Sequence, residues 1–441
     1  METEIDESRI LSGVYTAENY KRGSVFSYRI VLPKTPAPKE ETALLVGHDG
    51  LVQGDVFALD ALREEDRAPA CVILAVSPAE LPATLPDRNR RNMRLDDYDL
   101  FTSGYADFVV YELIPYLRAL YGDKFSFSDD PDLHAVRGGS SGGISAFCLA
   151  WFHPGFFRRV YMSSPSFLAM NRGNEVPVLI RKCETKPLRV YTEFSENEPD
   201  DYFGSSYCAA MEAERALRFA GYDFRSEYFP GLGHCARQFD AEHLYEVYGF
   251  LWNNWRTEPL RAPRNSPRVD CVVPFGSVWE RCDAFPGKEP VPDVRIPETE
   301  TPRTAAVLSS DGWMLYVSEK YRAAVSAYPV SADGTLGARY LHGMLHTRGD
   351  TVLPGAFDLC VDECDRVYAA TELGIQCIRS FGLIDVILDN PGGKPARRLA
   401  FDPAGAPYLY AETDDGCYRR KMIARGKHAE PTEPKFTSYF D

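Results

Sequence analysis

The sequence predicts an α/β fold with a mostly parallel, doubly wound sheet, followed by an all-β segment. Strand-like and helix-like stretches alternate from about residue 25 to residue 255, a pattern typical of a parallel sheet covered by helices on both faces. Prolines then crowd residues 256–303, and short strands separated by turns follow from Thr304. We therefore predict an α/β domain over 1–256, a proline-rich connector over 257–303 and an all-β part over 304–441.

The elements of the first part follow from their apolar patterns. Ala70 to Ser77, ACVILAVS, is a continuous apolar run, as expected of a strand buried on both faces. Tyr105 to Gly122 has helical periodicity with a broad apolar side. The predicted strands are VFSYRIVL (25–32), ALLVGHDG (43–50), ACVILAVS (70–77), LHAVRGG (133–139), RVYMSSP (159–165), LRVYTEF (188–194) and FRSEYFPG (224–231), and the predicted helices are 105–122, 142–154, 208–222 and 241–255.

The last part repeats one shape, an acidic turn followed by an aromatic-rich strand. The three copies recur roughly every 45 residues, and such a period suggests propeller blades. A closed propeller has about four to eight blades, so three copies predict only a partial propeller. The copies read SSDGWMLYVSEK, VDECDRVYAATE and FDPAGAPYLYAET.

Composition limits the function classes. The net charge of −15 disfavours nucleic acid and anionic membrane surfaces as partners, because both require a basic patch. The acidic start, METEIDESRILSG, does not resemble a signal peptide, and no apolar run is long enough to cross a bilayer. The eleven scattered cysteines then indicate reduced thiols in a cytoplasmic protein. We interpret Cys360 and Cys364 as core residues and expect neither a metal nor a cofactor.

A glycine-rich turn, RGGSSGGISA (137–146), is the main chemical signal. It lies between a predicted strand and a predicted helix, and the pattern G-x-S-x-G fits both Ser140 and Ser141. Such a turn exposes a serine hydroxyl, and the helix N-terminus directs backbone N–H groups at a developing oxyanion. The sequence therefore predicts a nucleophilic serine, while the pattern alone leaves the choice between the two serines open.

A serine nucleophile needs a base and an acid. In enzymes with this turn, the acid and then the histidine follow the serine along the chain. His234 follows the last predicted strand in the loop PGLGH, whereas His243 lies inside the last predicted helix. The acid should follow LRVYTEF, in the loop SENEPDD. Chain order does not choose among its carboxylates, which are Glu196, Glu198, Asp200 and Asp201.

Residues 12–255 resemble a known family. The stretches YADFVVYELIPYL, GGSSGGISAFCLAWFHPGFF and GLGH are similar to those of the enterochelin esterase / esterase D-like alpha/beta-hydrolases, which include acetyl and feruloyl carbohydrate esterases. The resemblance implies an alpha/beta-hydrolase fold and a serine esterase. Its paired glycines fall on Gly142 and Gly143, which places the nucleophile at Ser140.

The same resemblance implies the other site residues. The backbone N–H of Ser141 would be one oxyanion donor, and LLVGHDGL places the second at Leu51. Glu198 falls on the acid position, beside His234 as the base. Residues 87–97, DRNRRNMRLDD, resemble the segment before the helix; of the two roles open to their arginines, substrate contact and simple solvation, we expect solvation.

The C-terminal part resembles a portion of the gluconolactonase/regucalcin propeller, through LSSDGWMLYVSE, DLCVDECDRVYAATELGIQCI and PYLYAETDDGCYRRK. That family binds a divalent metal, but this segment is too short for six blades and Asp358 is one residue out of register with the family's aspartate. Because open sheet edges need covering, we expect this part to dock on its own esterase domain or on the partner in a homodimer.

The preferred function is therefore a serine esterase that acts on a small-molecule carboxylic ester, of small acyl, sugar-linked or siderophore type. Two alternatives remain open. One is a metal-dependent sugar lactonase that uses the C-terminal part, and the other is a non-catalytic binding protein on a hydrolase fold.

Overall fold

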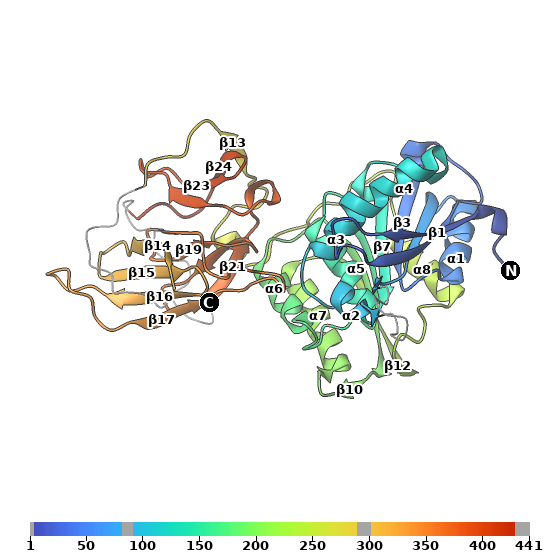
Figure 1. Cartoon of the computed structure of the whole chain (residues 1–441), viewed down its shortest axis with the longest axis horizontal. Coiled ribbons are helices and arrows are strands. Elements are labelled where there is room, and N and C mark those ends of the chain that lie inside the picture. Colours follow the sequence, from blue (N-terminus) through green and yellow to red (C-terminus); the bar gives the residue numbers. More distant parts are fainter. Residues whose placement is uncertain (1–3, 82–90, 289–300, 428–441) are drawn as a thin grey trace. The chain divides into compact units, whose positions relative to one another are not determined.

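The chain divides into two compact units (Figure 1), each of which is considered by itself. The computed structural model describes residues 4–81, 91–288 and 301–427. The first unit comprises Met1–Val178 and Thr185–Pro263, and the second comprises Leu179–Glu184 and Arg264–Asp441. The predicted domain limits at residues 256 and 303 stay predictions, and residues 289–300 of the predicted connector lie outside the described residues.

A ten-stranded sheet forms the centre of the first unit, in the order β12-β9-β8-β7-β3-β4-β2-β5-β6 with β1 paired to β2. The six strands from β12 to β4 are mutually parallel, whereas β2 is antiparallel to β4 and β1. This arrangement confirms the predicted α/β class. The strands are β1 Ile10–Thr16, β2 Val25–Val31, β3 Thr42–His48, β4 Ala70–Val76, β5 Glu80–Leu81, β6 Arg91–Asn92, β7 His134–Gly139, β8 Arg159–Ser163, β9 Arg189–Asn197 and β12 Asp223–Gly233.

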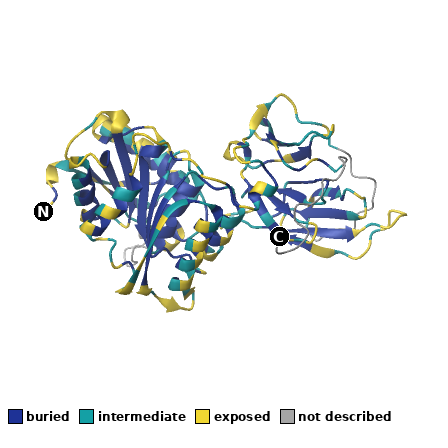
Figure 2. Cartoon of the chain, turned by 180° about the vertical axis from the view of Figure 1, so that it is seen from behind, coloured by how far each residue is buried: buried dark blue, intermediate teal, exposed yellow. Residues whose placement is uncertain are grey.

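Helices cover both faces of this sheet (Figure 1). α1 and α8 pack against each other on one face, and α3 and α5 lie together on the other. The strands β3, β4 and β7 are buried along their whole length, as Figure 2 shows, which agrees with the apolar sequences of β3 and β4, whereas β7 buries His134 and Arg137. The helices are α1 Gln53–Glu64, α2 Arg94–Tyr98, α3 Gly104–Phe108, α4 Ile114–Tyr121, α5 Ser141–Phe152, α6 Val176–Lys182, α7 Ser206–Ala220 and α8 Ala241–Leu251.

Three four-stranded antiparallel sheets make up most of the second unit. Each predicted acidic-turn copy connects two paired, consecutive strands of one sheet, that is β14 to β15, β18 to β19, and β22 to β23. β13, from the predicted connector, adds the outer strand of the third sheet. The strands are β13 Glu280–Cys282, β14 Arg303–Leu308, β15 Met314–Glu319, β16 Ala324–Pro329, β17 Tyr340–Met344, β18 Asp358–Val361, β19 Val367–Ala370, β20 Ile375–Ile378, β21 Ile384–Leu388, β22 Arg398–Phe401, β23 Tyr408–Thr413 and β24 Gly416–Lys421.

The two hydrophobic interiors are independent. One cluster joins α1 and α8 to the first sheet, and another fills the space between the second and third antiparallel sheets. All eleven cysteines are free thiols. Within the described residues, no helix combines the length and apolar character of a membrane span. The cytoplasmic location stays a prediction.

Candidate active site

Ser140 occupies a sharp turn between β7 and α5. Its φ of 55° and ψ of −123° lie in a region that non-glycine residues rarely adopt. The turn needs a glycine at position 138, because a Cβ there would lie 2.1 Å from the carbonyl oxygen of Gly142. Ser140 is partly exposed, whereas Ser141 is the first residue of α5 and is 2% exposed. This geometry is that of a nucleophile turn with Ser140 at its apex.

The end of β8 and the loop after it hold Ser140 in place. The N–H of Ser140 donates to the carbonyl oxygen of Ser163 at 2.9 Å, and Oγ of Ser140 lies 3.1 Å from Oγ of Ser166. Among the described residues no hydrogen bond joins Ser140 to His234. The Ser140 hydroxyl is therefore held by a neighbouring serine.

His234 and Glu198 lie together at the same edge of the sheet. Gly233 and Asn197, the last residues of β12 and β9, are register partners, so the residues that follow them emerge side by side. Nδ1 of His234 lies 2.5 Å from Oε2 of Glu198. The side chain of Glu198 is only 1% exposed, while that of His234 is 30% exposed. A buried carboxylate thus orients a histidine that remains open to solvent.

Further hydrogen bonds saturate Glu198. Its Oε1 accepts from Oγ of Ser164 at 2.5 Å and from the N–H of Ser195 at 3.0 Å. Although burial opposes the effect, hydrogen bonds from His234, Ser164 and Ser195 lower the pKa of Glu198. Contact with the side chain of Cys235, and then with Glu198, raises the pKa of His234 to about 10. Both shifts favour an ionised Glu198 beside a strongly basic His234.

The other predicted acids lie away from the histidine ring. Oε2 of Glu196 accepts from the N–H of Gly231 at 2.7 Å. Asp200 is an exposed residue of the two-residue strand β10 (Asp200–Asp201), and Oδ1 of Asp201 accepts from the N–H of Phe203 at 2.8 Å. Of the carboxylates that the sequence left open, the structure places Glu198 against His234.

The predicted oxyanion donors lie on two neighbouring segments. Ser141 is the first residue of α5, so its N–H has no acceptor within the helix. Leu51 follows a turn in which Asp49 and Gly50 have φ values of 63° and 93°. The sheet places these segments side by side, because β3 and β7 are adjacent parallel strands.

Arg94 connects these two segments. Its Nε and Nη2 bind the carboxylate of Asp49 at 2.7 and 2.8 Å, and Nη2 also donates to the carbonyl oxygen of Gly139 at 3.4 Å. The expectation that the arginines of 87–97 are solvated is thus wrong for Arg94, since a bidentate ion pair holds it against the nucleophile turn. Residues 82–90 lie outside the described residues.

Asp99 is a buried carboxyl group behind the first turn of α5. It is 0% exposed, and neither oxygen has a hydrogen-bond partner of good geometry. Burial raises the pKa of Asp99 to about 6, against opposing interactions with Ser141 and Arg94. An unpaired buried carboxylate is costly, so this group destabilises the fold when it ionises.

Two other histidines form buried contacts near the site. Nδ1 of His48 lies 2.9 Å from the carbonyl oxygen of Arg137, and its Nε2 lies 3.0 Å from Oγ of Ser145. Burial lowers the pKa of His48 to about 4, so this ring is neutral. Ser145 is itself 2% exposed inside α5, which keeps substrate away from this serine–histidine pair. His243, set aside from the sequence, contacts Glu193.

The C-terminal aspartate that resembled a metal ligand binds other groups of the protein. Asp358 pairs with Nζ of Lys288, and its Oδ2 accepts from the N–H of Leu399 at 2.8 Å. In the part of the chain that the structure describes, no group of three or more His, Cys, Asp or Glu side chains could hold a metal ion. Nothing in these contacts favours the lactonase alternative.

Comparisons with solved structures return esterases. A ferulic acid esterase is 17% identical, with 55% of this chain and 97% of that chain covered and a TM-score of 0.42. The enterobactin esterase FES from Shigella flexneri is 19% identical, with 54% and 59% covered and a TM-score of 0.41. The siderophore hydrolase EstB from Aspergillus nidulans is 17% identical, with 59% and 99% covered and a TM-score of 0.40. This chain thus spans less than two thirds of the Shigella enzyme.

Sequence comparison gives one family. No curated protein matches the chain. Residues 27–200 match the family model described as "Putative esterase", and this match covers β2 to β9 together with the Ser140 turn. Over residues 27–200 this chain is therefore similar to a family of esterases.

Proposed function

We propose that this chain hydrolyses carboxylic esters through a triad of Ser140, His234 and Glu198 and a covalent acyl-enzyme. The observation that carries the proposal is the His234–Glu198 pair at the sheet edge that also bears the Ser140 turn. Nδ1 of His234 faces the carboxylate, which leaves Nε2 to act as the base. A serine, a histidine and an acid in this order form the arrangement that activates a hydroxyl.

In the proposed reaction each of these groups has a distinct role. Nε2 of His234 takes the proton of Ser140 while Oγ forms a bond to the ester carbonyl carbon. The N–H groups of Ser141 and Leu51 stabilise the resulting oxyanion. His234 protonates the departing alkoxide as the ester bond breaks, and water, deprotonated by His234, releases the acid and restores Ser140. Glu198 stabilises the imidazolium at both steps.

We infer that the substrate is a small-molecule ester. The similar solved structures carry names for ferulic acid ester and enterobactin hydrolysis, which supports testing feruloyl esters and catecholate trilactones beside simple acyl esters. Acetylated sugars belong in the same panel because the sequence also resembles carbohydrate esterases. The net charge of −15 argues against nucleic acid as a partner.

The decisive experiment compares Ser140→Ala with Ser141→Ala on this panel. Ser140→Ala should lower kcat/KM by at least ~10³-fold, as expected for the loss of a triad nucleophile. Ser141→Ala keeps the backbone N–H and should retain activity. An aryl phosphonate should label Ser140, as peptide mass spectrometry would detect. Full activity of Ser140→Ala, or labelling of Ser141, would contradict the proposal.

We further infer that the C-terminal unit acts as a partial propeller that mediates a homodimer. Three four-stranded sheets support this inference, as does the edge strand β17, where Tyr340, Leu341 and Met344 are 46%, 50% and 62% exposed. An exposed apolar edge of this kind invites pairing. Light scattering of the full chain should give a dimer mass, and Leu341→Lys should shift it to a monomer. A monomer at every concentration would overturn this inference.

A further inference from the structure

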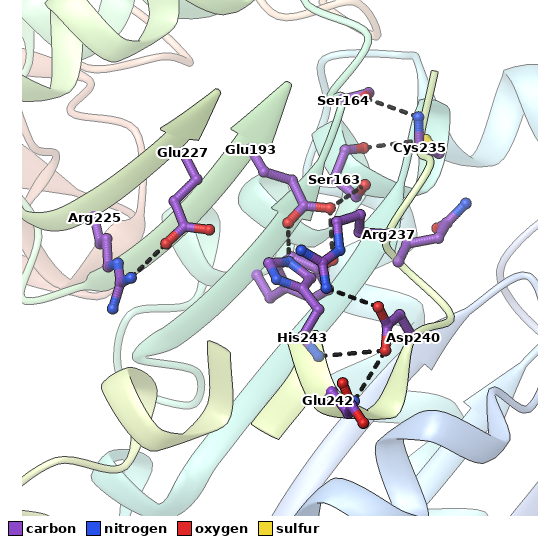
Figure 3. Close-up of polar contacts among 12 residues, drawn as sticks. Ser163, Ser164, Glu193, Arg225, Glu227, Cys235, Arg237, Asp240, Glu242 and His243 are labelled. Atoms are coloured by element: carbon purple, nitrogen blue, oxygen red, sulfur yellow. Dashed lines mark hydrogen bonds and ion pairs between the residues drawn. The ribbon is translucent and has the colours of Figure 1, made fainter. Parts of the chain in front are cut away.

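A second histidine–carboxylate pair lies beneath the candidate site. Glu193, on β9, and His243, in the first turn of α8, are 2% and 4% exposed, and Nε2 of His243 contacts Oε2 of Glu193 (Figure 3). The other carboxylate oxygen of Glu193 accepts from the hydroxyls of Tyr161, at 2.9 Å, and Ser163, at 2.7 Å. A buried charge persists only when its hydrogen bonds are satisfied, and these contacts satisfy it.

The Ser163 contact leads directly to the nucleophile. Ser163 is the last residue of β8, and its carbonyl oxygen accepts the N–H of Ser140 at 2.9 Å. The same oxygen accepts the Sγ–H of Cys235 at 3.4 Å, and Cys235 is the residue after His234. The side chain of Ser163 is fixed by Glu193, and the carbonyl group of the same residue contacts both the nucleophile turn and the loop that carries His234.

Ser164 adds a second connection. Its N–H donates to the carbonyl oxygen of Glu193 at 2.8 Å, and its φ of 43° is an unusual backbone conformation that the surroundings must hold. Its Oγ donates to Glu198 at 2.5 Å and accepts the N–H of Cys235 at 3.0 Å, the latter contact being visible in Figure 3. Glu193 thus holds two successive serines that contact all three segments bearing the proposed triad.

The imidazole of His243 is itself fixed from several sides. Oδ1 of Asp240, the cap of α8, accepts the backbone N–H of His243 at 3.5 Å. The rings of Phe229 and Tyr191 stand edge-on to the imidazole, with centroids 5.3 and 6.1 Å away. His243 therefore has a defined orientation from which to hold the Glu193 carboxylate.

We propose that Glu193 and His243 are positioning residues that set the placement of Ser140 relative to His234, an inference that rests on the proposed function. They touch no substrate and act through Ser163 and Ser164. Displacement of reacting groups by about 1 Å can cost on the order of 10²-fold in rate, so loosening this network should reduce turnover more than substrate binding.

The test compares four variants of the full chain. Ser163→Ala removes the hydroxyl that binds Glu193 but keeps the carbonyl group, and His243→Leu removes the partner of the carboxylate. Both should lower kcat by roughly 10- to 10²-fold with KM changed by less than about threefold. His243→Gln keeps an N–H donor and should restore much of the loss. The matched control is Thr185→Val. Thr185 is also buried and precedes the first residue of β9, and its Oγ1 donates to the carbonyl oxygen of Ala220 at 2.6 Å, a hydrogen bond that valine removes.

The value of kcat is calculated from the concentration of sites that an aryl phosphonate labels once the labelling reaction is complete. Unfolded protein, which is not labelled, then does not lower the measured kcat. The melting temperature of each variant is recorded beside it. Equal kcat losses for Ser163→Ala and Thr185→Val, or no difference between His243→Gln and His243→Leu, would overturn the positioning role while the proposed function stands. Absence of turnover and labelling in the wild type would overturn the proposed function, and this inference with it.

Discussion

Nδ1 of His234 lies 2.5 Å from Oε2 of Glu198, directly after the point where the neighbouring parallel strands β12 and β9 end in register. Adjacent register thus brings together two groups that are separated by more than thirty residues of sequence, and the contact with the carboxylate is made by Nδ1 of the histidine. Because the carboxylate is buried and accepts further bonds from Ser164 and Ser195, its position does not depend on the histidine alone.

Glu198→Gln should lower kcat by at least ~10²-fold, since the amide cannot stabilise the imidazolium that forms during reaction. Glu196→Gln is the matched control, because Glu196 lies two residues before Glu198, near the end of β9, and accepts the N–H of Gly231. Steady-state rates on one aryl ester measure both variants. Comparable losses in the two would show that the acid has been assigned to the wrong residue.

The activity should rise with pH through a midpoint above 6.5. His234 serves as base only when neutral, and contact with Cys235 and then Glu198 raises the pKa of His234 to about 10, so the acid limb of the profile moves upward. Glu198→Gln and Cys235→Ala each remove one cause and should shift the residual limb to lower pH. A profile of kcat/KM against pH measures this shift. A wild-type midpoint at or below 6.5 would contradict it.

Much of the fold could be predicted from local patterns. The fully buried strand β4 is a continuous apolar run and β3 is apolar over most of its length, and the acidic turns of the second unit mark three strand-to-strand connections. α1 was not predicted, because it begins after Val52 without a side-chain cap and so lacks a start signal. β1 and α6 were also missed.

The candidate site was predictable only in part. The Ser140 turn has a local sequence signature, and chain order pointed to His234. Ser163, Ser164 and Glu193 have no such signature, because their contacts depend on which strands are neighbours in the sheet. The two serines at the end of the predicted strand RVYMSSP were the available signal, since polar residues at the carboxyl ends of parallel strands gather at one edge. The Arg94–Asp49 pair likewise depends on tertiary contact.

Asp99→Asn should stabilise the protein at neutral pH. Burial raises the pKa of Asp99 from 3.8 to about 6, because the buried site favours the neutral carboxyl group. The contribution of Asp99 to the free energy of unfolding is therefore fully present below the unfolded pKa of 3.8 and is lost as pH rises through about 6. The gain at neutral pH should be about 3 kcal/mol, because the pKa rises from 3.8 to about 6 and one pKa unit corresponds to about 1.4 kcal/mol. Urea unfolding at two pH values measures it. A variant that is less stable than wild type at neutral pH would indicate that the carboxylate has a compensating partner.

Arg94→Gln should reduce kcat more than it changes KM. The guanidinium binds Asp49, which precedes the Gly50–Leu51 turn, and the carbonyl of Gly139, which precedes Ser140, so it fixes the distance between the two proposed oxyanion donors. Its removal should cost roughly 10- to 10²-fold, comparable to the misplacement of one oxyanion donor. Asp49→Asn should show a similar loss, because the pair acts as a unit.

The control for this pair is Arg256→Gln, which breaks the exposed ion pair between Arg256 and Asp66 at 2.7 Å. Exposed pairs contribute little, so this variant should keep its activity and its melting temperature. The two substitutions at the site should also weaken the binding of a boronate that mimics the tetrahedral intermediate by more than they weaken the binding of a substrate-like amide. Equal weakening of both ligands would mean that Arg94 contributes to ground-state binding and does not organise the oxyanion donors.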